Sequence, residues 1–202
     1  MAMEAAFARS LEEQYAAAAR RYSEVSELLA EVQNGYFVDE WEDSGVGADF
    51  VPMGGEGFAP FMSGASNDNS YVFRLHRYHA VEGSLEALIQ RVADDWRERG
   101  WETKVSGPFA GYSRVATVTP GGFSLTAQED DGMLTLIASS PAYWGDPDAL
   151  AAAVIERGEA ESAAGVHGSK YARVDGFARL LPGTYRPFPA WDALEKYPPV
   201  TE

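Results

Sequence analysis

The 202-residue chain contains no cysteine. This absence excludes disulfide bonds, cysteine nucleophiles, cysteine-based zinc sites and iron–sulfur clusters. The chain also lacks any run of about 18 consecutive apolar residues, so it predicts no transmembrane helix. Its N-terminus has no charged region followed by an apolar one, so no secretory signal is predicted there. The expected location is the cell envelope if an export or lipidation segment has been removed, and otherwise the cytoplasm.

Basic residues are scarce in the first third of the chain. The whole chain has 31 Asp and Glu against 16 Lys and Arg, a formal net charge of −15. Residues 1–70 hold 13 of these acids and only 3 bases, and no Lys or Arg stands between Arg21 and Arg74. Phosphate binding depends on Lys and Arg, so this balance argues against a nucleic-acid partner. It favours a basic protein partner, although an acidic surface also serves solubility alone.

The sequence contains no motif of a familiar catalytic or cofactor site. The glycine-rich stretch 54–57 lacks the Lys-Ser/Thr pair of a phosphate-binding loop, and no Gly-x-Ser-x-Gly elbow marks a nucleophile. His76 and His79 stand three positions apart, so on a strand they point to opposite faces and do not share a metal. The acids at 39–49 lack the spacing of a calcium-binding EF-hand loop. We therefore expect no cofactor and no metal, and we favour a function without catalysis.

The clearest structural pattern lies in residues 71–139. Apolar and polar residues alternate over 71–78, which predicts a strand with one buried face. Ser84 is a suitable helix N-cap. An apolar stripe at spacings of three and four follows it as far as Trp96, and Gly100 is the predicted end of that helix.

Four more strands follow in the same stretch. They are predicted at 101–105, 112–119, 123–127 and 133–137. Gly107-Pro108 predicts a turn between the first two. The acidic residues 129–132 end in Asp-Gly, which predicts that the last two strands form a hairpin. This order of elements predicts an α+β fold, with a mostly antiparallel sheet packed under one or two helices.

A long N-terminal helix is predicted in front of this core, over residues 4–33. Apolar and aromatic residues alternate at spacings of four and three from Leu11 to Val32, and Asn34-Gly35 predicts the end of the helix. Two interpretations are open. The stripe packs on the chain's own sheet, which we favour, or it forms a seam for self-association.

The chain is expected to form one domain with extensions. The predicted parts are a helix at 1–35, an α+β domain at 36–181 with its core at 71–139, and a Pro- and aromatic-rich tail at 182–202. A further helix begins at Asp146-Pro147 and runs to about Gly158, with a possible continuation to 164. Short strands are predicted at 171–174 and 176–181. The tail either drapes over the domain or stays extended.

The candidate binding surface lies between the N-terminal helix and the core. Residues 39–69 are rich in glycine and asparagine and too long for a tight connection, and such segments are either functional or disordered. The segment also carries apolar side chains that a solvated linker does not need. The candidate partner-binding residues are Asp39, Glu40, Trp41, Glu42, Asp43, Asp49, Phe58 and Phe61.

The layout of the chain resembles that of the LppA-like lipoproteins of actinobacteria. The similarity consists of a helix at 22–33 followed by Trp41, a helix that ends at Arg99-Gly100-Trp101, and strands that end in a hairpin at 123–137. It covers about residues 10–145 and implies a cell-envelope location and a binding role, with no site residues to transfer. Members of that family carry a lipidated cysteine and usually further cysteines, whereas this chain has none.

These observations support two functional hypotheses. The first is a non-enzymatic binding or interaction module, whose working surface is residues 39–69 and one face of the sheet. The second is an immunity-type inhibitor, a small acidic protein that covers the active site of a basic toxin. It follows from the ten acids that lie between Arg21 and Arg74 without a base among them. An enzyme of unrecognised class is a third interpretation, and it predicts a deep pocket with convergent polar groups.

Overall fold

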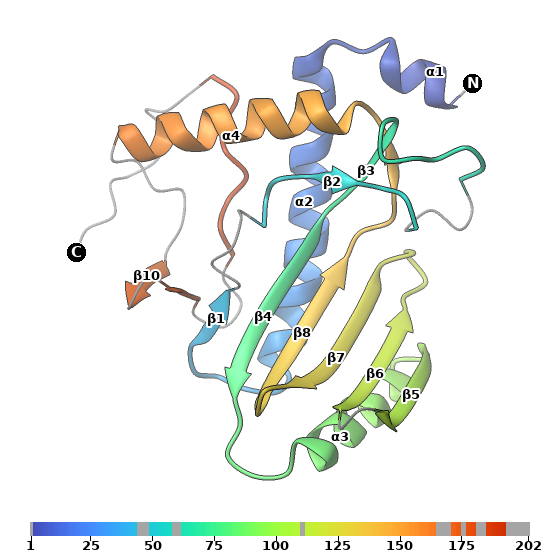
Figure 1. The fold of residues 1–202 in the computed structure, drawn as a ribbon, viewed down its shortest axis with the longest axis vertical. Coiled ribbons are helices and arrows are strands. Elements are labelled where there is room, and N and C mark those ends of the chain that lie inside the picture. Colours follow the sequence, from blue (N-terminus) through green and yellow to red (C-terminus); the bar gives the residue numbers. More distant parts are fainter. Residues whose placement is uncertain are drawn as a thin grey trace.

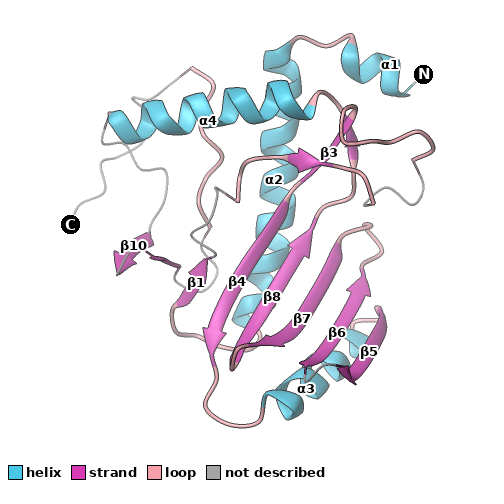
Figure 2. Cartoon of the chain, in the orientation of Figure 1, coloured by secondary structure: helices cyan, strands magenta, loops and turns pink. Residues whose placement is uncertain are grey.

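The computed structural model describes residues 2–43, 49–57, 62–109, 112–164, 171–174, 177–180 and 185–192. Within these ranges the chain adopts an α+β fold, which confirms the predicted class. A large sheet is covered on one side by helices, and a small sheet lies at one end of it (Figure 1). Figure 2 shows the same arrangement coloured by type of element. Every strand pair in the described ranges is antiparallel.

The elements have the following bounds. The helices are α1 (Ala2–Phe7), α2 (Leu11–Asn34), α3 (Leu85–Glu98) and α4 (Pro147–Ala163). The main sheet has the strand order β10 (Tyr171–Val174), β11 (Phe177–Leu180), β1 (Trp41–Asp43), β4 (Arg74–Ala80), β8 (Met133–Ser139), β7 (Ser124–Asp130), β6 (Tyr112–Val118) and β5 (Glu102–Phe109). The small sheet has the order β2 (Met53–Gly54), β3 (Ser70–Val72) and β9 (Tyr143–Trp144).

Helices cover only one face of the main sheet. α2 packs against β4 and β8, and α3 packs against β5, β6 and β7. Both lie behind the sheet in Figure 1, while α4 lies above it and packs against α2 and β2. The strand register places Leu75, Leu125 and Leu136 on the covered face, where all three are buried. The hydrophobic core therefore lies between this face and the two helices.

The N-terminal helix is interrupted, so the prediction of a single helix over 4–33 was wrong at its front end. Ser10 Oγ accepts a hydrogen bond from the N–H of Glu13, and the Glu13 carboxylate accepts one from the N–H of Ser10. This reciprocal capping box starts α2 afresh after α1. The stripe from Tyr15 to Val32 is buried in the chain's own core, as favoured. The seam considered for self-association is thus occupied within the chain.

α3 has the start and the end that were predicted for it. Ser84 is its N-cap. At its other end Gly100 has a φ of +78°, a value that glycine tolerates without the steric cost of a Cβ. The N–H groups of Gly100 and Trp101 donate to the carbonyls of Arg97 and Trp96. This pair of bonds is a Schellman motif, which satisfies carbonyls that the helix end leaves open.

The strand predicted at 71–78 is divided between two sheets. β3 belongs to the small sheet and β4 to the main one, with a break at Phe73. The backbone N–H of Phe73 donates to Ser140 Oγ and its carbonyl accepts from the N–H of Ser140, so no ladder partner is needed at that position. The break allows one extended segment to serve both sheets.

The two predicted turns had opposite outcomes. The turn at Gly107-Pro108 was wrong, because β5 continues through it with a shift of register against β6. Such an irregularity accommodates a proline, which cannot donate a ladder hydrogen bond. The hairpin of β7 and β8 is confirmed, and Asp131 and Gly132 have the two positive φ values, 48° and 78°, of a type I′ turn.

The C-terminal elements follow the prediction in outline. α4 runs without interruption through Gly158, where a Cβ would lie 3.5 Å from the ring of Phe50. A side-chain methyl group at this position would make an ordinary contact with that ring, so the packing does not require the glycine. β10 and β11 form the expected pair of short strands. The described part of the tail, residues 185–192, lies over the domain, the first of the two arrangements considered.

Candidate functional site

The structure moves two of the candidate binding residues into the interior. Trp41, in β1, is fully buried, and its Nε1–H donates to the carbonyl of Phe37 over 3.5 Å. Asp49 is largely buried as well, and its carboxylate accepts from the guanidinium of Arg77. These two side chains therefore hold the fold together from within. The binding hypothesis for this segment accordingly depends on its remaining members.

The other candidates differ in what the structure shows of them. Asp39 and Glu40 are exposed and directly precede β1. Glu42 is half-buried in β1, and its partner in the ladder with β4 is Tyr78. The side chain of Asp43 and the whole of Phe58 and Phe61 lie outside the described residues. Among the candidates whose side chains the structure describes, Asp39, Glu40 and Glu42 are therefore the ones that a partner can reach.

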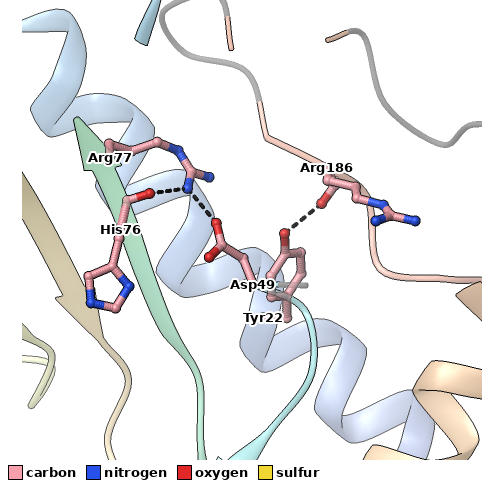
Figure 3. A network of polar contacts seen from close by, with 5 residues as sticks. All are labelled: Tyr22, Asp49, His76, Arg77 and Arg186. Atoms are coloured by element: carbon pink, nitrogen blue, oxygen red, sulfur yellow. Dashed lines mark hydrogen bonds and ion pairs between the residues drawn. The ribbon is translucent and has the colours of Figure 1, made fainter. Parts of the chain in front are cut away.

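The interior network around Arg77 joins four parts of the chain (Figure 3). Arg77 is on the covered face of β4 and is only 1% exposed. Its Nη1 donates to the Asp49 carboxylate and, over 2.6 Å, to the carbonyl of His76. Close by, the hydroxyl of Tyr22 donates to the carbonyl of Arg186 over 2.7 Å. Figure 3 shows the imidazole of His76 pointing away from this cluster.

The electrostatics of this network indicate a structural role. Burial raises the pKa of the Asp49 carboxyl, and the charge of Arg77 opposes that rise. Burial also raises the pKa of the Tyr22 hydroxyl well above its usual value. All three groups are shielded from solvent, so a substrate in water has no direct access to them. Their contacts instead connect α2, β4, the segment at 49 and the C-terminal segment.

A second contact, between His79 and Asp39, fixes the start of the segment 39–69. His79 Nε2 lies 2.8 Å from Asp39 Oδ1, and the His79 ring stacks on Phe37 with 3.9 Å between centroids. The hydrogen bond from His79 lowers the pKa of Asp39. His79 is buried whereas the Asp39 side chain is 70% exposed. In a catalytic His–Asp pair the carboxylate is buried behind the imidazole, so this opposite order indicates a tether between the segment and β4.

The uncovered side of the main sheet presents a broad set of side chains, which we call the open face. In Figure 1 the labelled helices lie behind or above the sheet, and the open face is turned to the viewer. Its members follow from the register and the alternation of side chains along each strand. They are Glu42 of β1; Arg74, His76, Tyr78 and Ala80 of β4; Met133, Thr135, Ile137 and Ser139 of β8; Ser124, Thr126, Gln128 and Asp130 of β7; Arg114, Ala116 and Val118 of β6; and Glu102, Lys104 and Ser106 of β5.

The middle of the open face combines hydroxyl groups with aromatic rings. The rings of His76 and Tyr78 are parallel to within 10°, with 6.5 Å between centroids. Burial, together with the nearby charges of Arg74 and Arg77, lowers the pKa of His76, so its ring is neutral at pH 7. Thr135 Oγ1 is buried and has no hydrogen-bond partner among the described residues. A buried hydroxyl without a partner is uncommon and calls for an explanation.

A groove with a volume of about 310 Å³ lies where the C-terminal ends of α2 and α3 meet. Its lining residues are Val32, Gly35, Tyr36, Asp95, Trp96, Glu98 and Arg99. Burial, and next the charge of Asp95, raises the pKa of Tyr36 to about 12. The negative ends of two helices and two carboxylates suit a cation there, and the Arg99 guanidinium, 2.6 Å from Glu31, already supplies one. We therefore assign the groove no ligand.

The described ranges contain no group of three or more His, Asp or Glu side chains placed to hold a metal ion. No helix in them has the length and apolar character needed to cross a bilayer.

The members of the open face could not be grouped from the sequence, because they come from six strands. The signal available in the sequence was the alternation within each strand, which marks one face of each strand but does not show which faces align. No protein-family model, curated protein or solved structure matches the chain. A functional assignment therefore rests on the residues and geometry described above.

Proposed function

We propose that the protein is a non-enzymatic binding module, whose working surface is the open face together with Asp39 and Glu40. The observation that supports this proposal is the one-sided cover of the main sheet, with α2 and α3 on the same face. An antiparallel sheet commonly has one solvated face. The residues of the open face distinguish it from a surface that is merely solvated.

The open face differs in charge from the rest of the chain. Arg74, Lys104 and Arg114 bring three cations to it, in a chain whose formal net charge is −15. Its acids, by contrast, stand on β1, on the edge strand β5 and at the hairpin end of β7. Apolar groups lie between the cations, and Val118 is 57% exposed. The hydroxyl groups of Thr126, Thr135 and Ser139 are buried, so this face offers a partner its cations and its exposed apolar groups, a mixture suited to a protein.

Site-specific photo-crosslinking tests this proposal. A photoreactive phenylalanine analogue is placed at Val118 on the open face, and at Ile155 of α4, which is 47% exposed, as a control. We expect a discrete crosslinked partner from position 118 in cells that produce the protein. The crosslink should be lost with Arg114→Glu and kept with Arg20→Glu, an exposed α2 position. Equal crosslinking from both sites would contradict the proposal.

The immunity-type function is a second candidate, supported by a different surface. Glu24, Glu27 and Glu31 are exposed at spacings of three and four on α2, which gives that helix an acidic outer stripe. A basic partner that binds there would associate faster at low ionic strength, because salt screens exposed charges over about 10 Å at 0.1 M. Crosslinks from position 24 and a steep salt dependence would favour this candidate. Affinity that is indifferent to salt would count against it.

The resemblance to LppA-like lipoproteins adds a location to the first proposal. We propose that the module acts at the cell envelope. Fractionation of cells that produce the protein, followed by detection with an antibody, tests this. Recovery only with cytoplasmic proteins would contradict the envelope location and leave the binding proposal unaffected.

A further inference from the structure

The segment 185–192 is bound to the domain in an unusual way. It is extended, and no backbone–backbone hydrogen bond joins it to another element among the described residues. It runs beside α4 and α2 (Figure 1). Its backbone is held instead by side chains of the domain, and the hydroxyl of its own Tyr185 donates to the Glu27 carboxylate over 3.5 Å. This is how a groove holds an extended peptide, rather than how a strand joins a sheet.

Two tyrosines of α2 bind the backbone of the segment. The hydroxyl of Tyr15 donates to the carbonyl of Pro189 over 2.9 Å, and that of Tyr22 donates to the carbonyl of Arg186 over 2.7 Å. Seven residues along a helix span about 10 Å. Three residues of an extended chain span about 9 Å. The distance between the two tyrosines along α2 thus matches the distance between the two carbonyls along the segment. The segment therefore lies antiparallel to α2 in a fixed register.

The third hydrogen bond comes from α4. Glu161 is only 2% exposed, and its Oε1 accepts from the N–H of Ala190 over 3.1 Å. A carboxylate is costly to bury unless it is hydrogen-bonded or paired. The N–H that satisfies Glu161 belongs to the segment itself. The domain thus presents a buried acceptor whose described partner is a peptide backbone.

Two aromatic side chains of the segment pack against residues of α2 and α4 in the same groove, at two positions that we call the sockets. Phe188 is buried, with its ring centroid 5.0 Å from that of Tyr15 and 5.6 Å from that of Tyr22. The ring of Trp191 lies 5.0 Å from Tyr15, and the guanidinium of Arg157 lies 4.7 Å from its centroid. Pro187 and Pro189 flank Phe188 in the sequence. Proline limits the unbound conformations of such a segment and so lowers the entropic cost of binding it.

We propose that the groove formed by Tyr15, Tyr22, Arg157 and Glu161 is a binding site for an extended peptide of a partner protein. The peptide would carry the pattern seen in 185–192, an aromatic residue next to proline and a second aromatic three positions later. The three hydrogen bonds involve only backbone atoms of the peptide. The two aromatic contact sites of the groove would therefore determine which side chains the peptide carries. The chain's own segment occupies the site in cis. This site is separate from the open face and does not depend on the function proposed there.

Occupation in cis makes a quantitative prediction. A tethered segment competes at an effective concentration of the order of millimolar. A free peptide should therefore bind the wild-type chain weakly and should bind more tightly once the tethered segment is weakened. The test uses the full chain and a fluorescent peptide with the sequence of residues 185–192. Binding is measured by fluorescence anisotropy.

The decisive variant carries Phe188→Ala and Trp191→Ala, which empty both sockets without altering the groove. We expect it to bind the peptide at least tenfold more tightly than wild type. Adding Tyr15→Phe and Tyr22→Phe should weaken that binding about tenfold, since two hydrogen bonds are lost. A peptide with alanine in place of its phenylalanine is the matched control and should not bind. Failure of a folded double variant to gain affinity would overturn the proposal.

A measurement on the wild-type chain keeps the proposal testable if the double variant does not fold. The Trp191 indole N–H is followed by NMR while unlabelled peptide is added to several times the effective concentration of the tether. Displacement of the segment should move this signal, and an unchanged signal would contradict exchange. If the chain instead dimerises by exchanging its segment with a second copy and binds no peptide, the groove serves self-association. That result would likewise overturn the proposal.

Discussion

The guanidinium of Arg77 and the carboxylate of Asp49 form an ion pair beneath the main sheet, where neither side chain is more than 10% exposed. Arg77 comes from the middle of β4, and Asp49 from a segment that looks, by composition, like an exposed acidic loop. The pair therefore turns an apparent surface acid into part of the interior. It also attaches that segment to the centre of the sheet.

The ion pair predicts a strong loss of stability when only one partner is removed. Arg77→Met leaves the Asp49 carboxylate buried without its cation, and the free energy of unfolding should fall by about 3–5 kcal/mol. The double variant Arg77→Met/Asp49→Leu removes both charges and should recover most of that loss. Chemical denaturation monitored by circular dichroism measures both. A single variant within about 1 kcal/mol of wild type would contradict this role, given that measured core effects usually exceed that value.

The tether between Asp39 and His79 predicts a pH dependence. Because the pKa of Asp39 is lower in the folded chain than its usual 3.8, the unfolded chain binds this proton more tightly. The tether therefore contributes stability above pH 3.8, and that contribution is lost as the pH falls through the lower, folded pKa. The difference in melting temperature between wild type and Asp39→Asn should be larger at pH 7 than near pH 3. A difference that does not change with pH would contradict the tether.

The carboxyl of Asp39 also offers a direct readout. An NMR titration should place its pKa below 3.8 in the wild-type chain. In the variant His79→Phe the pKa should rise toward that value, because the hydrogen bond from the imidazole is gone. An Asp39 pKa that is the same in both chains would show that another group lowers it.

Two glycines should respond to alanine with opposite signs. Gly100 has a φ of +78°, so Gly100→Ala should lower the free energy of unfolding by about 1 kcal/mol. Gly158 lies inside α4, and a Cβ there would make an ordinary 3.5 Å contact with Phe50. Gly158→Ala should therefore raise the free energy of unfolding by about 0.5–1 kcal/mol. Thermal unfolding compares them, and equal signs would contradict the assigned backbone roles.

Thr135 separates stability from binding on the open face. Its Oγ1 is buried without a hydrogen-bond partner among the described residues, so Thr135→Val keeps the shape and removes an unsatisfied hydroxyl. The free energy of unfolding should stay the same or rise by up to about 1 kcal/mol. Because Thr135 is only 1% exposed, it offers no group to a partner, and crosslinking from position 118 should be unchanged in the same variant. A clear loss of stability would show that the hydroxyl serves the fold.

Local signals account for the elements that the sequence predicts well. α3 is defined by its apolar stripe, by Ser84 and by Gly100, all of which act within one or two turns of the helix. The hairpin depends on Asp131-Gly132, whose backbone preference is also local. Even the missed break before α2 had a local sign, since Ser10 and Glu13 have the spacing of a capping box.

The candidate site depended on contacts between distant residues, and there prediction failed in part. Nothing near Asp49 in the sequence indicates that Arg77, 28 positions later, will bury it. Nothing near Trp41 indicates that β4 and β11 will enclose its strand. The groove for residues 185–192 likewise needs Tyr15 and Glu161, which are far apart along the chain.

Periodicity, capping and turn preferences act over a few residues, and they were sufficient to predict the fold class, both ends of α3 and the hairpin of β7 and β8. The burial of particular acids, the open face of the main sheet and the position of the C-terminal segment became evident only in the assembled fold. Those outcomes depend on the register of six neighbouring strands and on pairings across many positions. The physical reason is that burial and ion pairing are properties of the assembled core, and no short stretch of sequence carries them.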